Sequence, residues 1–210
     1  RWSLNWFYDR FELPMMIVEN GFGAYDKKEA DGTVDDQYRI DYLKEHRPEL
    51  LNELCKIDGI KWIRFLYAYP ETITDELIDV VKNNDKICNY FDIPIQHISN
   101  KVLKRMNRKS DGESIRKVVA KIRKEIPNVI IRTTVMVGFP GETNEDFDEL
   151  YEFIKEAKFD RLGAFSYSKE DGTPAARIKE QIHPMTKKSR YNKIMALQQK
   201  VYEEILSILV

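Results

Sequence analysis

Beyond residue 60 of the 210-residue chain, short apolar runs bounded by turn residues alternate with longer amphipathic segments. The short runs are typical of buried strands, and the longer segments have the three-to-four-residue apolar spacing of helices. We predict strands at residues 62–67, 89–95, 129–137 and 161–167, and helices at residues 74–81, 99–106, 113–125, 144–157 and 187–209. This alternation favours right-handed crossovers and a parallel sheet, as part of an α/β barrel or of a doubly wound sheet.

Polar residues precede several of these helices. Thr74, Ser99 and Asn144 are predicted as N-caps, since their side chains can accept from the free N–H groups of a first helical turn. Further upstream, the pattern predicts a buried strand at residues 13–18 and helices at residues 35–45 and 49–55. The sequence begins without Met inside one amphipathic pattern and ends inside another, so we interpret it as cut at both ends.

Composition narrows the class of protein. Hydrophobic residues make up 42% of the chain and charged residues 33%, which is ordinary for a soluble globular protein. The net charge of -1 neither requires nor excludes a nucleic-acid partner. Two cysteines far apart, Cys55 and Cys88, form neither a disulfide framework nor a metal-ligand spacing. With no apolar run of membrane-spanning length and no signal peptide, we expect a cytoplasmic protein.

Candidate chemistry lies in loops that follow the predicted strands, where parallel α/β folds place functional residues. Gln96 and His97 end one strand, and they could bind a ligand or merely satisfy local backbone groups. Arg132 lies within an apolar strand and therefore needs a carboxylate partner, from the protein or from a ligand.

The loop at residues 138–143 allows backbone to approach a ligand closely, although such loops often serve turn geometry only. The loop at residues 167–176 has the composition of a polar surface turn. Glu19 follows a predicted buried strand, where a carboxylate suits acid–base or nucleophilic chemistry or is simply the first solvated position.

Four motifs in order resemble the radical-SAM methylthiotransferases: DIPIQH with VLKRM at residues 92–97 and 102–106, RTT at 132–134, GFPGET at 138–143 and YSKEDGTPAA at 167–176. The resemblance runs from about residue 47 to the end. It implies a partial radical-SAM-type (β/α) barrel with parallel strands. It also implies S-adenosylmethionine (SAM) and a 4Fe-4S cluster as cofactors of methylthio transfer. The Gln-His pair and the acidic loop resemble the type that modifies an aspartate of a small-subunit ribosomal protein, which implies that substrate and contact with the ribosome or RNA.

By this resemblance the cofactor-binding residues are Gln96, His97, Arg132, Gly138, Gly141 and Glu142. The chain departs from the family at one point. The Cys-x-x-x-Cys-x-x-Cys triad that ligates the cluster is absent, and Cys55 and Cys88 do not match it. We therefore expect this chain alone to lack the radical reaction, or to be a non-catalytic module that binds SAM.

Residues 1–46 resemble a different family. LPMMIVENGFG at residues 13–23 and DGTVDDQYRIDYL at 31–43 are similar to family 1 glycoside hydrolases, in which Glu19 would be the nucleophile. The Asn-Glu-Pro motif that supplies the second carboxyl group is absent. The predicted organisation is thus a glycosidase-like strand–helix fragment at 1–46, a partial radical-SAM barrel at 47–182, and a helix at 183–210 that leads to an RNA-binding-type domain.

Overall fold

The computed structural model describes Arg10 and residues 47–209, and it separates the chain into two compact units. Within the described residues, the first unit contains residues 47–64 and 72–88, and the second contains 65–71 and 89–209. The strand predicted at 13–18, the helix predicted at 35–45 and the candidate nucleophile Glu19 lie outside the described residues.

The first unit is mainly helical. It contains a helical segment at residues 47–55 and helix α3 (Asp75–Lys82), and the chain returns to it within the 3-10 helix η1 (Pro70–Thr72). Thr74 accepts a hydrogen bond from the Leu77 backbone and caps α3, as predicted. The strand predicted at residues 62–67 is wrong, because only one isolated parallel bridge forms, between Ile63 and Ile87. Tyr67 has a φ of 55°, which ends any extended run there.

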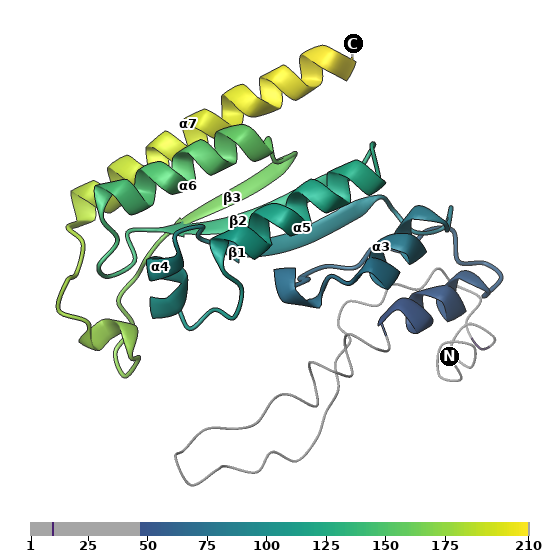
Figure 1. Ribbon diagram of the computed structural model, residues 1–210, viewed down its shortest axis with the longest axis horizontal. Helices are drawn as coiled ribbons and strands as arrows, with labels where there is room; N and C mark the ends of the chain where they lie inside the picture. Colours follow the sequence, from purple (N-terminus) through teal and green to yellow (C-terminus); the bar gives the residue numbers. More distant parts are fainter. Residues whose placement is uncertain (1–9, 11–46, 210) are drawn as a thin grey trace, which may run out of the picture. The chain divides into compact units, whose positions relative to one another are not determined.

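The second unit is built on a three-stranded parallel sheet with the order β1 (Tyr90–Gln96), β2 (Ile130–Val137), β3 (Arg161–Ser166). Helices α4 (Asn100–Arg105) and α5 (Gly112–Glu125) connect β1 to β2, and α6 (Asn144–Ala157) connects β2 to β3. The 3-10 helix η2 (Ala175–Arg177) and the long α7 (Pro184–Leu209) follow (Figure 1). The predicted parallel α/β architecture is confirmed.

One face of this sheet is covered by helices. Side chains alternate along β2: Ile131, Thr133, Val135 and Val137 are buried, whereas the residues between them are more exposed. Arg116 of α5 contacts Glu149 of α6, and α7 contacts both α6 and β3. The three long helices α5, α6 and α7 therefore lie side by side (Figure 1).

Capping explains where the crossover helices begin. Asp111 forms a capping box with Ser114 at α5, and Thr143 forms one with Asp146 at α6. The prediction of Asn144 as N-cap is wrong by one residue, since Asn144 is the first helical residue. Ser99 occupies the N-cap position of α4, but its hydroxyl donates to Asp146 instead of capping.

Among residues 47–209 no helix combines the length and the apolar character that crossing a bilayer requires.

Two adjacent residues of β2 test which face of the sheet carries the core. Ile131 is 0% exposed and Ile130 is 41% exposed. We expect Ile131→Ala to lower the free energy of unfolding by about 2–5 kcal/mol, since it opens a cavity beneath the helices. Ile130→Ala removes the same atoms from the open face and should cost less than about 1.5 kcal/mol. Urea denaturation of both variants is the measurement, and equal losses would contradict this assignment of faces.

Candidate functional site

The carboxyl ends of β1 and β2 carry most of the predicted site residues. Gln96 closes β1 with a φ of 67°, and the register with β2 shifts between Ile93 and Gln96. A left-handed conformation at a residue other than glycine or asparagine is unusual, and such strain clusters at functional sites. The Gln96 side chain is half-buried and has no hydrogen bond within residues 47–209, so it remains available to a ligand.

The loop after β2 is a tight turn at residues 138–142. Gly138 and Gly141 have φ values of 73° and 80°, and a side chain at either position would collide with Lys187 or Arg105. Phe139 anchors the turn in an apolar cluster with Val102 and Tyr167. The backbone of the turn is thus fixed by close packing on both sides.

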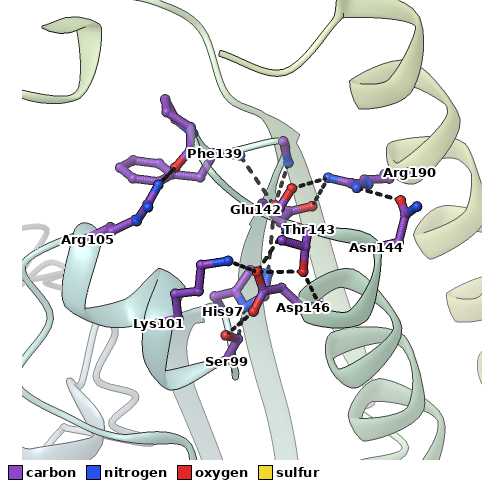
Figure 2. A network of polar contacts seen from close by, with 12 residues as sticks. His97, Ser99, Lys101, Arg105, Phe139, Glu142, Thr143, Asn144, Asp146 and Arg190 are labelled. Carbon is purple, nitrogen blue, oxygen red and sulfur yellow. Dashed lines mark hydrogen bonds and ion pairs between the residues drawn. The ribbon is translucent and has the colours of Figure 1, made fainter. Parts of the chain in front are cut away.

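Glu142 fixes the same turn by hydrogen bonding. Its Oε2 accepts from the backbone N–H groups of Gly138, at 2.7 Å, and Phe139, at 3.3 Å. Its Oε1 lies 2.7 Å from Nη1 of Arg190 on α7, and Arg190 also donates to Oδ1 of Asn144 at 2.9 Å (Figure 2). The Glu142 side chain is 0% exposed, so this carboxylate is part of the protein interior.

His97 lies in the same network. Its Nδ1 accepts from the Ser99 N–H at 3.0 Å, which places the ring proton on Nε2, 3.7 Å from Glu142 Oε2. Burial, opposed by Asp146 and aided by Arg190, lowers the pKa of His97 to about 4. His97 is therefore a neutral ring at physiological pH, and it is enclosed by protein.

Asp146 ties α4 to the start of α6 beside this ring. It accepts from the Ser99 hydroxyl at 2.7 Å, from Lys101 Nζ at 3.2 Å and from the Thr143 N–H at 2.8 Å (Figure 2). Burial opposes ionisation, but these hydrogen bonds outweigh it and lower the pKa of Asp146 to about 2. Asp146 stays ionised under ordinary conditions and holds two helices together.

Arg132 has a partner within the protein. Its Nη1 lies 2.8 Å from Oδ2 of Asp92, which is fully buried, and the two residues are register partners on β1 and β2. Arg132 is five residues before Val137, or roughly 16 Å along the strand from its carboxyl end. The structure therefore places Arg132 away from the turn at residues 138–142.

Apart from Arg132, the predicted residues are either accessible at the strand end or buried behind the turn. Gln96 is accessible at the strand end, and the backbone of Gly138 and Gly141 forms the turn beside it. His97 and Glu142 are buried supports of this turn, and their predicted contact with a ligand stays a prediction. Sequence reasoning missed Arg190, because a charge on a long helix is usually solvated and nothing in the sequence linked it to Glu142.

The described residues do not fit an iron–sulfur cluster. Cys55 and Cys88 are the only cysteines of the chain, both unpaired, and no group of three potential metal ligands exists among residues 47–209. Burial raises the pKa of the Cys55 thiol against the effect of Lys86, which disfavours the thiolate that a cluster requires.

Comparison with known families agrees with this fold. Residues 31–154, more than half of the chain, match the Radical SAM superfamily. The chain belongs to this superfamily. The match begins at residue 31, within the segment that resembles a glycoside hydrolase, and none of the relatives described below is a glycosidase. The role of Glu19 stays a prediction.

Among curated proteins, the chain is similar to enzymes named ribosomal protein uS12 methylthiotransferase RimO. It is 70% identical over 171 residues to that of Alkaliphilus oremlandii, which covers 81% of this chain and 39% of the relative. It is 56% identical over 164 residues to that of Clostridioides difficile, which covers 78% of this chain and 37% of the relative. The chain therefore spans about two fifths of the length of these relatives.

Two solved structures share the fold. Coproporphyrinogen III oxidase (HemN) from Escherichia coli, a radical SAM enzyme, matches with a TM-score of 0.60 at 21% identity, over 75% of this chain and 37% of the oxidase. The radical SAM methyltransferase TsrM from Kitasatospora setae matches with a TM-score of 0.53 at 16% identity, over 65% of this chain and 28% of TsrM. The sheet and its helices are thus part of a radical-SAM-type barrel.

The buried His97 predicts a pH-dependent stability. Its pKa is about 4 in the folded chain against an ordinary value of 6.5, so between these values only the unfolded chain binds the proton. Stability should therefore fall as the pH falls from 6.5 towards 4. Between pH 7 and pH 5 the wild type should lose about 2 kcal/mol more than His97→Gln, which cannot be protonated. Urea denaturation at both pH values measures this, and equal losses would contradict a neutral buried ring.

Proposed function

We propose that this chain is part of a radical-SAM methylthiotransferase that modifies an aspartate of ribosomal protein uS12. Identities of 70% and 56% to enzymes of that name support the reaction and the substrate. The proposal includes a cytoplasmic location and contact with the ribosome or its RNA. The segment from residue 183, most of it in α7, would lead towards the RNA-binding-type domain.

The position and backbone conformation of the turn at residues 138–142 support a SAM-binding role. It lies at the carboxyl end of a central parallel strand, where α/β folds bind ligands. Two glycines with positive φ leave its backbone uncovered by side chains of its own. The N–H groups of the turn already donate within the protein, to Glu142, Glu180 and Phe139, so the turn would meet an adenosine through its carbonyl groups without reorganising.

Gln96 and the backbone of the turn would hold SAM. His97 and Glu142 would support the turn from the protein interior. Arg132, whose guanidinium is paired with Asp92 on the sheet, would contact SAM at a distance from the turn. Bound SAM would supply radical chemistry only together with a 4Fe-4S cluster, which these residues do not hold. The residues of this chain bind and orient the cofactor and do not ligate the cluster.

A pair of glycine variants tests the SAM site. Gly138→Ala and Gly172→Ala both place an L-residue at positive φ, but only the first lies in the turn, and Gly172 has open space around it. We expect SAM affinity, measured by calorimetry, to fall at least about tenfold for Gly138→Ala and to stay unchanged for Gly172→Ala. A wild-type chain that does not bind SAM would overturn the proposal.

The missing cysteine triad predicts the absence of radical chemistry in this polypeptide. After anaerobic treatment with iron and sulfide and reduction, we expect no 5′-deoxyadenosine from SAM, because the cluster has no three-thiolate site. The Alkaliphilus oremlandii relative, treated in parallel, should form the product. Robust product from this chain, detected by liquid chromatography, would refute the prediction.

A further inference from the structure

Arg190 is a buried arginine of the second unit. It lies on α7, the helix that comes after β3 in the chain. It is 6% exposed, and its guanidinium reaches Glu142, 48 residues earlier. Nη1 lies 2.7 Å from Glu142 Oε1 and 3.3 Å from the Glu142 carbonyl oxygen, and Nη2 lies 2.9 Å from Asn144 Oδ1. The Phe147 ring covers the guanidinium, with the centroid 5.4 Å from Cζ. Four contacts thus fix one orientation of this side chain.

The other oxygen of Glu142 faces the turn. Because Oε2 accepts from both Gly138 and Phe139, the carboxylate joins α7 to the two residues that open the turn. A buried carboxylate is costly unless a cation or several donors compensate its charge. Arg190 supplies that charge, so the ionised state of Glu142 depends on α7.

We propose that Arg190 is a positioning residue that, through Glu142, keeps the turn at residues 138–142 in its SAM-binding conformation without touching the ligand. This inference rests on the proposed function for its ligand only. The contacts from Arg190 through Glu142 to the turn do not depend on which ligand the turn binds.

Other charged groups around Glu142 do not replace Arg190. His97 is neutral, and Lys101 is paired with Asp146. Lys187 packs its stem against Gly138 but donates from Nζ to the Tyr167 carbonyl. Arg105 donates to the Pro140 carbonyl and is paired with Glu180. Within the described residues, Arg190 is the cation that contacts the Glu142 carboxylate.

The chemistry of Glu142 makes this role measurable. Burial raises the pKa of Glu142, and Arg190, followed by the N–H groups of Gly138 and Phe139, opposes the rise. Without Arg190 the pKa must rise further, so Glu142 takes up a proton as the pH falls through a higher range. A neutral carboxyl group accepts more weakly from the turn than a carboxylate does.

The first experiment measures SAM affinity by calorimetry at pH 6, 7 and 8. We expect Arg190→Met to bind at least about tenfold more weakly than wild type at pH 6 and to recover as the pH rises, while the wild type stays flat. Arg190→Lys should recover part of the affinity. Combining Glu142→Gln with Arg190→Met should remove the pH dependence, because glutamine does not titrate. Lys193→Met is the matched control, since Lys193 lies over the same Phe147 ring but does not contact Glu142.

The second experiment measures the turn without any ligand. The amides of Gly138 and Phe139 should exchange with deuterium at least about tenfold faster in Arg190→Met than in wild type, while the Val135 amide inside β2 is unchanged. If Arg190→Met does not fold, the exchange of the same two amides is measured in Arg190→Lys and in the double variant, and the same outcomes decide. Unchanged exchange at Gly138 and Phe139 overturns the inference. Failure of the wild type to bind SAM overturns the proposed function alone.

Discussion

The buried carboxylate of Glu142 is the constraint on which the rest of this site depends. One oxygen accepts from the turn after β2 and the other from Arg190 on α7, so a loop, a strand end and a distant helix share one anion. An unpaired charge at this depth would be strongly unfavourable. The fold must therefore bring α7 against the start of α6 before the turn can keep its conformation. Packing of α7 on β3 and α6 meets that requirement.

Apolar packing and the ion pair act on different parts of the turn. Phe139 enters the cluster with Val102 and Tyr167, which fixes the position of the turn against α4 and the end of β3. Dispersion and burial are not directional, so this cluster alone would allow the backbone to rotate. The two N–H groups bound to Glu142 remove that freedom. Gly138 and Gly141 lack side chains, so Lys187 and Arg105 pack directly against the backbone of the turn.

Sequence periodicity predicted the three strands and the helices α3 to α7, because the helices and β2 bury one face and β1 is a continuous buried run. It failed at residues 62–67, where the apolar run is as strong but Tyr67 turns left-handed and only Ile63 makes a bridge. It placed Gln96, His97 and Glu142 at strand ends, but a position along the chain does not tell which way a side chain points. For the same reason the sequence did not identify Asp92 as the partner of Arg132. Arg190 was beyond reach, since its role arises from a contact across 48 residues.

The distribution of these residues separates two tasks that a radical-SAM enzyme must combine. Orienting SAM would need a rigid backbone surface, and the turn at residues 138–142 is held rigid by its own internal support. Cleaving SAM needs three thiolates on one cluster, and neither Cys55 nor Cys88 lies in such a spacing. The support of the turn comes wholly from residues between His97 and Arg190, so it does not depend on the cluster. The conformation of the turn is therefore set by the packing and the ion pair of this chain, separately from any cluster.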